Sequence, residues 1–381
     1  MSSRLIVNSI RHTGGSADAV TLASDGTCTA NITNKPNTNI LMNGAMLVAQ
    51  RGTSSTSNGY QTIDRFAVFY GGTDEAPTQA QVDLTSSDTP YSLGFRKALK
   101  VTNGNQTSGA GTNDFIEIMQ KFEGQDINSS GWDFTSSSSF ITISFWIKSS
   151  VAQTFYGKMR ITEASANKEY TFAVNATTSW QKITKTIPGA SGLNPVNTNA
   201  LGGWFDLIPF FGTAYSGSMT LDQWNTYDAS AAVPDMTSTW YTTNDATLEY
   251  TGLKMEVGSV ATDFEHRSYG QELSLCQRYY IRLTAGGSNA LHFTGSTKQQ
   301  QYVSCARVEL PTTMRTAPSI SFTGTRDILN YSNDNSGYSG DKIDVNSFNI
   351  RWGSSNTIGD GTAYTAALTG DPNYIEVSAE L

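Results

Sequence analysis

The sequence predicts an all-β protein made of antiparallel sandwiches, and three observations support this fold class. Charged residues are only 15% of the chain, against about 25% in typical soluble proteins, and Ser, Thr, Asn and Gly fill the difference. Several segments alternate polar and apolar residues, as half-buried strands do, and turn-forming loops separate them. We find no long helix between these segments, which favours antiparallel sandwiches over a parallel sheet.

Size and charge narrow the function classes. The 381 residues suggest two or three domains, and 7 Trp, 17 Tyr and 17 Phe supply enough apolar area to exclude disorder. With a net charge of -8, the chain lacks the excess of basic residues that a nucleic-acid binder needs, so we expect no nucleic acid partner. No apolar run reaches membrane-spanning length and the start lacks a signal-peptide core, so we expect no membrane insertion and assembly in a cytoplasm.

The first region, residues 1–37, alternates short apolar runs with Gly, Ser and Asp turns. Two or three short strands fit this pattern, but their apolar area is too small for independent stability. We therefore expect a segment that docks on another chain or forms trimers. A flexible arm is the alternative.

The second region, residues 38–268, holds the clearest strands. Residues 115–122 and 140–148 alternate polar residues with bulky β-formers. Further strands are expected at 170–174, 180–187 and 248–257. Together they predict one antiparallel sandwich.

The third region opens with a predicted connecting helix, residues 269–285. Ser268 can cap its start, and an apolar stripe recurs at helical spacing. A helix of about 15 residues is marginal alone in water, so we expect the stripe to bury on its own body and on symmetry mates of a homotrimer. The alternative is a linker helix packed within one chain. The stripe consists of Leu273, Cys276, Tyr280 and Leu283.

Residues 286–381 predict a smaller C-terminal β-sandwich. Strands are expected at 302–310, 319–323, 347–352 and 375–379, and Trp352 should be buried at the end of its strand.

Four ordered motifs of the second region resemble jelly-roll carbohydrate-binding modules: Asn39–Gly44, ISFWIKSS, TTSWQKITKTI and LKMEVGSVATDFEHR. The segment from Asp263 to Tyr280 is similar to one in tail-fibre and other structural proteins of marine and related tailed bacteriophages. The N-terminal SIRHTGGSADAVTLASDGT, NGAMLVAQRGTSST and RFAVFYGGTDEAPTQAQVD are similar to the same group, so the resemblance covers residues 1 to about 280. Residues 310–318 resemble the connector of phage fibre C-terminal domains.

This resemblance implies a jelly roll, a short helix and a C-terminal β-domain in a virion tail appendage. Such an appendage is commonly a homotrimer that joins other virion tail proteins and contacts host-surface glycans. We therefore expect a tail-fibre or receptor-binding protein that attaches a phage to host polysaccharide. The alternatives are a non-adhesive tail or capsid component and a glycan-cleaving fibre.

Catalytic residues are not expected. A glycosidase needs two carboxylates that face one sugar bond, about 5 to 10 Å apart. The candidates Glu117, Glu123, Asp222, Asp228 and Asp235 are common surface types that meet by chance, so we expect a protein that is not an enzyme. No GxSxG elbow occurs, and three scattered histidines argue against a His-based triad or metal centre. His266 is expected to bond a backbone carbonyl.

No cofactor is expected, although a structural calcium ion is left open. Oxygen ligands gather in one Gly-rich loop, at Asp334, Asn335, Asp341 and Asp344, but turn capping explains the same residues. The resemblance to jelly-roll modules implies a separate calcium site near the first and last strands, with no ligands that the sequence can name. Three separated cysteines suggest neither a disulfide framework nor a thiolate zinc site.

Glycan recognition needs aromatic faces that stack on a pyranose, ringed by amides and hydroxyls. In the aromatic-rich stretch 204–241, Phe205, Phe210 and Phe211 are expected in a core or subunit interface. The candidates for exposed glycan contacts are Trp224, Tyr227 and Trp240, and in C-terminal loops Tyr331, Tyr338 and Tyr364.

Overall fold

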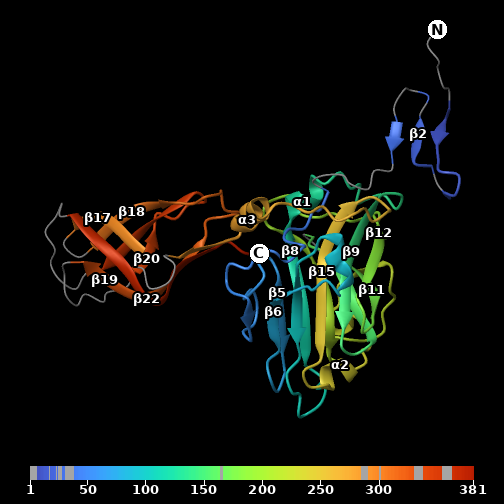
Figure 1. Ribbon diagram of the computed structural model, residues 1–381, viewed down its shortest axis with the longest axis horizontal. Helices are drawn as coiled ribbons and strands as arrows, with labels where there is room; N and C mark the ends of the chain where they lie inside the picture. Colours follow the sequence, from blue (N-terminus) through green and yellow to red (C-terminus); the bar gives the residue numbers. More distant parts are fainter. Residues whose placement is uncertain are drawn as a thin grey trace, which may run out of the picture.

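The computed structural model describes residues 7–16, 18–22, 24, 28–30, 38–163, 166–284, 291–299, 302–329, 338–353 and 363–381. It confirms the all-β fold class, with several antiparallel sheets and only short helices (Figure 1). The N-terminal strands β1 (Ser9–Ile10), β2 (Val20–Leu22) and β3 (Cys28–Ala30) form a small sheet of their own. The three short strands match the expectation, while the docking role stays a prediction.

The central domain is a sandwich of two six-stranded antiparallel sheets. Sheet I has the strand order β14-β11-β10-β13-β8-β5, and sheet II has the order β12-β9-β15-β7-β6-β4. The chain passes repeatedly from one sheet to the other, as a jelly roll does. The bounds in sheet I are β5 (Ala67–Gly71), β8 (Phe115–Glu123), β10 (Gln153–Ile161), β11 (Lys168–Ala176), β13 (Leu201–Phe211) and β14 (Trp224–Thr226). Those in sheet II are β4 (Ser54–Ser55), β6 (Thr78–Asp83), β7 (Lys97–Thr102), β9 (Phe140–Ser149), β12 (Gln181–Pro188) and β15 (Thr247–Val257).

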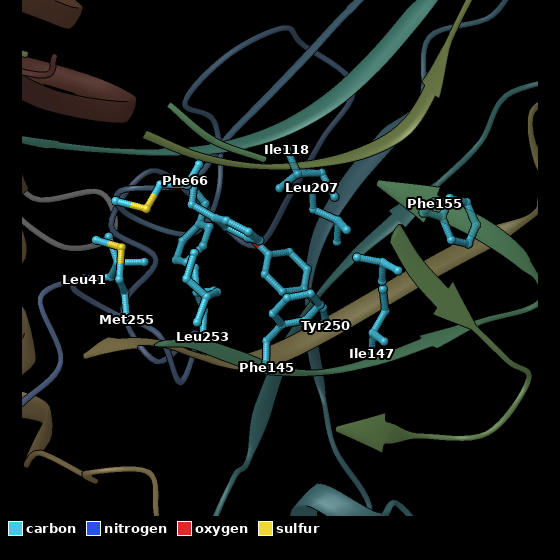
Figure 2. Close-up of a cluster of buried hydrophobic side chains, with 14 of the residues drawn as sticks. Leu41, Phe66, Ile118, Phe145, Ile147, Phe155, Leu207, Tyr250, Leu253 and Met255 are labelled. Atoms are coloured by element: carbon cyan, nitrogen blue, oxygen red, sulfur yellow. The ribbon is translucent and has the colours of Figure 1, made fainter. Parts of the chain in front are cut away.

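The core fills the space between the two sheets (Figure 2). Alternate residues of β9 point inward, so Phe145 and Ile147 are buried while Trp146 faces out. Phe145 meets Tyr250 of the same sheet at 6.2 Å between ring centroids, and Phe205 of sheet I at 5.6 Å. The expectation that Phe205, Phe210 and Phe211 are buried is confirmed. Their strand, β13, is not among the predicted strands.

We predict that Phe145→Ala lowers the free energy of unfolding by about 3–5 kcal/mol, because the cavity would lie between two packed sheets that cannot collapse into it. Urea denaturation measures this change. The matched control is Phe134→Ala, a half-buried ring at the edge of the same core, which should cost clearly less. Equal losses in the two variants would contradict the central position of Phe145.

Short helical turns connect the strands of the central domain: η1 (Thr89–Leu93), α1 (Gly124–Asn128), η2 (Ala229–Ala231) and α2 (Thr239–Thr242). No helix among the described residues is long and apolar enough to cross a membrane.

Seven strands form the C-terminal domain, with the order β16-β22-β17-β18-β21-β20 and β19 added to β22. The long strand β22 (Ala363–Ser378) pairs with three others, so the sheet closes over a single core that includes Ile281, Phe348 and Val377. All four predicted strand segments are found. The remaining bounds are β16 (Tyr280–Thr284), β17 (Leu291–Gln299), β18 (Tyr302–Glu309), β19 (Ser319–Leu329), β20 (Tyr338–Asp341) and β21 (Ser347–Gly353).

The connecting helix is shorter than predicted. Helix α3 (Tyr269–Gln277) starts at the expected cap, where Ser268 and Gln271 form a capping box, but it ends before Tyr280. Tyr280 and Leu283 lie in β16, because pairing with β22 and burial of β-forming residues outweigh the local helical pattern.

The predicted stripe is therefore not one helical face, because only Leu273 and Cys276 lie on α3, while the trimer itself stays a prediction. Cys276 and Tyr280 are 0% and 2% exposed inside their own chain, and Leu283 packs on the C-terminal core. Leu273 is half-buried on α3. Burial raises the pKa of the Cys276 thiol well above its ordinary value, so this thiol is unreactive. The alternative, a linker helix packed within one chain, matches these contacts.

Glu123 joins the two large domains at the end of β8. Its carboxylate accepts two hydrogen bonds from Arg278, at 2.8 and 2.9 Å, and a third from the Tyr279 hydroxyl at 2.6 Å. Both donors lie between α3 and β16, so one buried carboxylate holds the start of the C-terminal domain against the jelly roll.

A second group of contacts surrounds the end of the chain, which lies beside α3 between the two domains (Figure 1). Glu380 pairs with Arg65 and, at 3.2 Å, with Arg51 of the jelly roll. Lys121 Nζ donates to the Leu381 carbonyl at 2.7 Å. Because the last residues contact the central domain directly, the junction is a packed interface and not a loose tether.

Candidate functional site

The outer face of sheet I carries a cleft of about 230 Å³. Strands β8, β10 and β13 supply its floor, and the segment that follows β13 supplies one wall. The lining residues are Phe115, Glu117, Met119, Lys158, Arg160, Trp204, Phe211, Tyr215, Tyr227, Ala229 and Ala232. We call this the sheet I cleft.

Strand alternation places the polar residues of the cleft on one face. In β10, Met159 and Ile161 are buried in the core, so Lys158 and Arg160 point the other way. Across the sheet, Lys158 lies opposite Asp206 and Arg160 lies opposite Trp204. The pairing of β13 with β8 then brings Lys121 beside Trp204.

The guanidinium of Arg160 lies over two aromatic rings. Its Cζ lies 3.6 Å from the ring centroid of Tyr227 and 4.5 Å from that of Trp204. Cation–π contacts of this kind stabilise both partners and fix the rings. Trp204 Nε1 also donates to Asp206 at 2.8 Å, and Tyr227 remains 37% exposed. The cleft thus presents a held pair of aromatic side chains at its rim.

Two of the residues that line the cleft, Lys158 and Arg160, are paired with buried carboxylates beside it. Lys158 Nζ lies 3.5 Å from Asp206 and 3.8 Å from Glu169, and Arg160 lies 3.3 Å from Glu169. All four side chains are buried, so each charge needs its partner to offset the cost of desolvation. Among the described residues, Arg160 Nε and Asp206 Oδ1 have no hydrogen-bond partner.

Glu117 adds a third carboxylate on the same face. Burial, and then the nearby charge of Asp206, raise the pKa of Glu117 from 4.5 to about 7, while Lys158 and Arg160 oppose this shift. Burial also raises the pKa of Asp206. Near neutral pH, Glu117 therefore exchanges between a protonated form that can donate a hydrogen bond and an ionised form that cannot.

We predict that Glu117→Gln raises the melting temperature at pH 8 and leaves it nearly unchanged near pH 4. In the wild type, the unfolded chain loses the Glu117 proton near pH 4.5 and the folded chain near pH 7, so this group lowers stability progressively as pH rises between these values. Glutamine stays neutral at every pH, so the variant does not lose this stability as the pH rises. Thermal unfolding of both proteins across this range measures the difference, and a constant difference at all pH values would contradict the raised pKa.

The three predicted site residues of the central domain lie in three different surroundings. Tyr227 lines the sheet I cleft, which makes it the one candidate at the site. Trp224 is half-buried, where its indole donates to the Pro188 carbonyl at 2.7 Å and packs 5.6 Å from Tyr170. The prediction for Trp240 is wrong: its ring is 0% exposed, because α2 turns it into the core, where Phe155 meets it edge-on.

The C-terminal candidates lie partly outside the structure. Tyr331 falls outside the described residues. Tyr338 begins β20 and Tyr364 lies in β22, so both are strand residues and not the expected loop residues. The side chains of these two residues and of Trp352 are not among the described ones.

The carboxylates that were considered and rejected as a catalytic pair make other contacts. Asp222 pairs with Lys185 at 2.5 Å, Asp228 caps η2 and Asp235 accepts from Ser216 at 2.9 Å. Glu123 is held at the domain junction, away from Glu117 at the cleft. As expected, His266 Nε2 lies 2.8 Å from a backbone carbonyl, that of Leu93.

Nothing in the described part of the chain groups three or more His, Cys, Asp or Glu residues around a possible metal ion. Asp344 accepts from the backbone nitrogens of Asn346 and Ser347, at 2.7 and 2.9 Å, which is the turn-capping alternative to calcium binding. Asp334 and Asn335 lie outside the described residues, and Asp341 ends β20.

Sequence reasoning missed Lys158, Arg160, Trp204 and Asp206. A usable signal was present in β13, where Trp204-Phe205-Asp206-Leu207 alternates outward and inward residues. The neighbouring glycines and the many aromatic residues concealed this alternation. The pairing of β10 with β13, which joins these four residues, is a tertiary feature that no local pattern contains.

Comparison with solved structures returns distant likenesses. A CBM4 structure shares 12% identity, covering 57% of this chain and 99% of its own, with a TM-score of 0.29. A family 11 carbohydrate-binding module from Clostridium thermocellum, in complex with a beta-1,3-1,4-mixed-linked tetrasaccharide, shares 10% identity over 56% of this chain and 98% of its own, with a TM-score of 0.26. The enzymatically active domain of tailspike protein 4 of bacteriophage CBA120 shares 9% identity over 59% of this chain and 22% of its own, with a TM-score of 0.31.

These TM-scores are too low to assign a shared function. No protein-family model matches the chain, and no curated protein matches it.

Proposed function

We propose that this chain binds glycan in the sheet I cleft. The observation that carries the proposal is that two aromatic rings, Trp204 and Tyr227, line a polar cleft and both contact the guanidinium of Arg160. Aromatic faces stack on the apolar face of a pyranose, while charged and hydroxyl groups beneath them bond its hydroxyls.

The cleft is prepared for a ligand before binding. Trp204 is oriented by its bond to Asp206, and Arg160 is oriented by Glu169. Side chains that are already fixed lose little conformational entropy on binding, which favours affinity from a small contact area. Arg160, which lines the cleft, also has its Nε without a hydrogen-bond partner among the described residues.

We propose binding without cleavage. Hydrolysis of a glycosidic bond needs two carboxylates, one as acid and one as base or nucleophile. Asp206 and Glu169 are both engaged by buried cations, which leaves Glu117 as a single carboxylate with a raised pKa. Incubation with polysaccharide should release no reducing ends, and their release would overturn this part of the proposal.

For the biological role, we propose a homotrimeric tail fibre or receptor-binding appendage of a tailed phage, which attaches the virion to host cell-surface polysaccharide. Its support is the sequence resemblance over residues 1 to about 280. In this proposal the N-terminal segment joins other virion tail proteins. Several copies on one particle would raise avidity without new contacts, since single sugar contacts are weak.

The test is binding of the fluorescently labelled, purified protein to candidate host cells, before and after periodate oxidation of their surface sugars. Binding that periodate removes supports a glycan adhesin. Light scattering of the same sample measures whether it is a trimer. A folded trimer that binds no cell that the phage infects would favour the alternative, a non-adhesive virion component.

A further inference from the structure

We propose that the junction between the two large domains contains a second saccharide site, which takes a short neutral oligosaccharide. It is a groove of about 350 Å³, which we call the junction groove. Ligand pockets have volumes of about 300–1,000 Å³ and occur preferentially at domain interfaces, so both size and place suit a small ligand. Its lining residues are Arg51, Tyr60, Gln61, Tyr280, Arg282, Ser319, Ser321, Glu376, Ser378 and Glu380.

The C-terminal sheet supplies the floor of the groove. Strand β22 lies between β16 and β19, so Ser378 stands between Tyr280 and Ser319, and Glu376 stands between Arg282 and Ser321. The alternate residues of β22, Ile375 and Val377, are buried in the core, so Glu376 and Ser378 point to the other face.

The jelly roll supplies the wall of the groove, through Arg51, Tyr60 and Gln61. The contacts of Glu380 and Tyr280 with Arg51 hold this wall against the floor: Arg51 lies 3.2 Å from Glu380, and its Cζ lies 3.4 Å from the ring centroid of Tyr280. Neither domain alone would form the site.

The chemistry of the lining favours a ligand rich in hydroxyl groups and without charge. Three serine hydroxyls and one amide line the groove. Ser319 donates to the Ser378 carbonyl and Ser321 to Glu376, each at 3.2 Å, so their oxygens remain as acceptors for sugar hydroxyls. Arg282 is paired with Glu376 at 2.9 Å, and Arg51 is paired with Glu380. Both guanidinium groups therefore already have a carboxylate partner, which disfavours the carboxylate of an acidic sugar.

Two polar atoms of the wall are not satisfied within the described chain. The Tyr60 hydroxyl and Arg51 Nη1 are buried and have no hydrogen-bond partner among the described residues, and Nη1 is 3.8 Å from the nearest Asp64 oxygen. Buried polar groups in folded proteins are almost always paired. A ligand hydroxyl, or a water held by that ligand, would supply the missing hydrogen bonds of these two atoms.

The test uses the whole chain carrying Trp204→Ala and Tyr227→Ala, so that the sheet I cleft no longer contributes. The probe is an array of neutral hexose oligosaccharides, with the corresponding uronic-acid oligosaccharides beside them. We expect this double variant to keep binding to neutral spots. Adding Ser321→Phe, which fills the groove at an exposed strand position, should reduce that binding at least about tenfold.

The matched control is Thr294→Phe, at an exposed strand position of the same domain outside the groove, which should leave binding unchanged. Gln61→Ala removes an amide from the wall without filling the groove and should weaken binding several-fold. The proposal is overturned if the double variant binds no spot, if Ser321→Phe has no effect, or if uronic-acid spots are preferred. If the single cleft changes do not weaken wild-type binding while Ser321→Phe does, the junction groove stands and the proposed function of the sheet I cleft fails.

Discussion

Trp204→Ala is expected to weaken glycan binding at the sheet I cleft roughly 30-fold. The indole forms one side of the aromatic pair and lies across the sheet from Arg160 on one side and Lys121 on the other. Truncation would remove the stacking face and free Asp206 from its bond to Nε1. Loss of such a central aromatic contact costs about 2 kcal/mol or more of binding free energy, which raises the dissociation constant roughly 30-fold.

Titration with a glycan that binds the wild type measures this change, and thermal unfolding shows whether the variant is folded. Trp146→Ala is the matched control, because this half-buried tryptophan lies on the outer face of the opposite sheet, away from the cleft. It should leave the dissociation constant unchanged. Equal effects of the two substitutions would place binding elsewhere.

Glu123→Ala is expected to have the largest effect on the attachment of the C-terminal domain. This carboxylate is fully buried and accepts three hydrogen bonds from Arg278 and Tyr279. The substitution leaves the Tyr279 hydroxyl and the Arg278 side chain, which is 29% exposed, without their acceptor, and such a loss costs about 1–3 kcal/mol. We expect a lower free energy of unfolding and a wider range of distances between the two domains in solution scattering.

The control for this variant is Asp83→Ala. Asp83 pairs with Lys97 at 2.6 Å, but its side chain is 78% exposed, and exposed ion pairs contribute about 0–1 kcal/mol. It should change neither stability nor the scattering profile by more than a small amount. If Glu123→Ala behaved in the same way, the junction would depend on the contacts of Glu380 instead.

The Glu123 pair should also make the junction sensitive to acid. Burial alone would raise the pKa of Glu123, but the hydrogen bonds from Arg278 and Tyr279 outweigh it and hold the pKa below the ordinary 4.5. A lowered folded pKa contributes stability that is fully present above pH 4.5 and is lost as pH falls through the folded value. Scattering at pH 7 and below pH 4 should therefore show the domains separating in acid, and an unchanged profile would contradict this.

The local strand pattern could be predicted well from the sequence. In β8 and β9, polar and apolar residues alternate over nine and ten residues, and such a period is a property of the chain itself. The start of α3 was predictable for the same reason, because Ser268 and Gln271 form its cap within a few residues. The burial of Phe205, Phe210 and Phe211 followed from their apolar neighbours.

Distant pairing decided the features that local patterns missed. Tyr280 and Leu283 continue a helical stripe in the sequence, yet hydrogen bonds from β22, almost a hundred residues later, make them a strand. Trp240 has polar neighbours in the sequence, but the fold encloses it completely. The sheet I cleft joins residues of β8, β10 and β13, so its chemistry exists only once these strands pair. The alternation of polar and apolar residues depends only on neighbours in the sequence, whereas a binding face consists of residues that only the folded chain brings together.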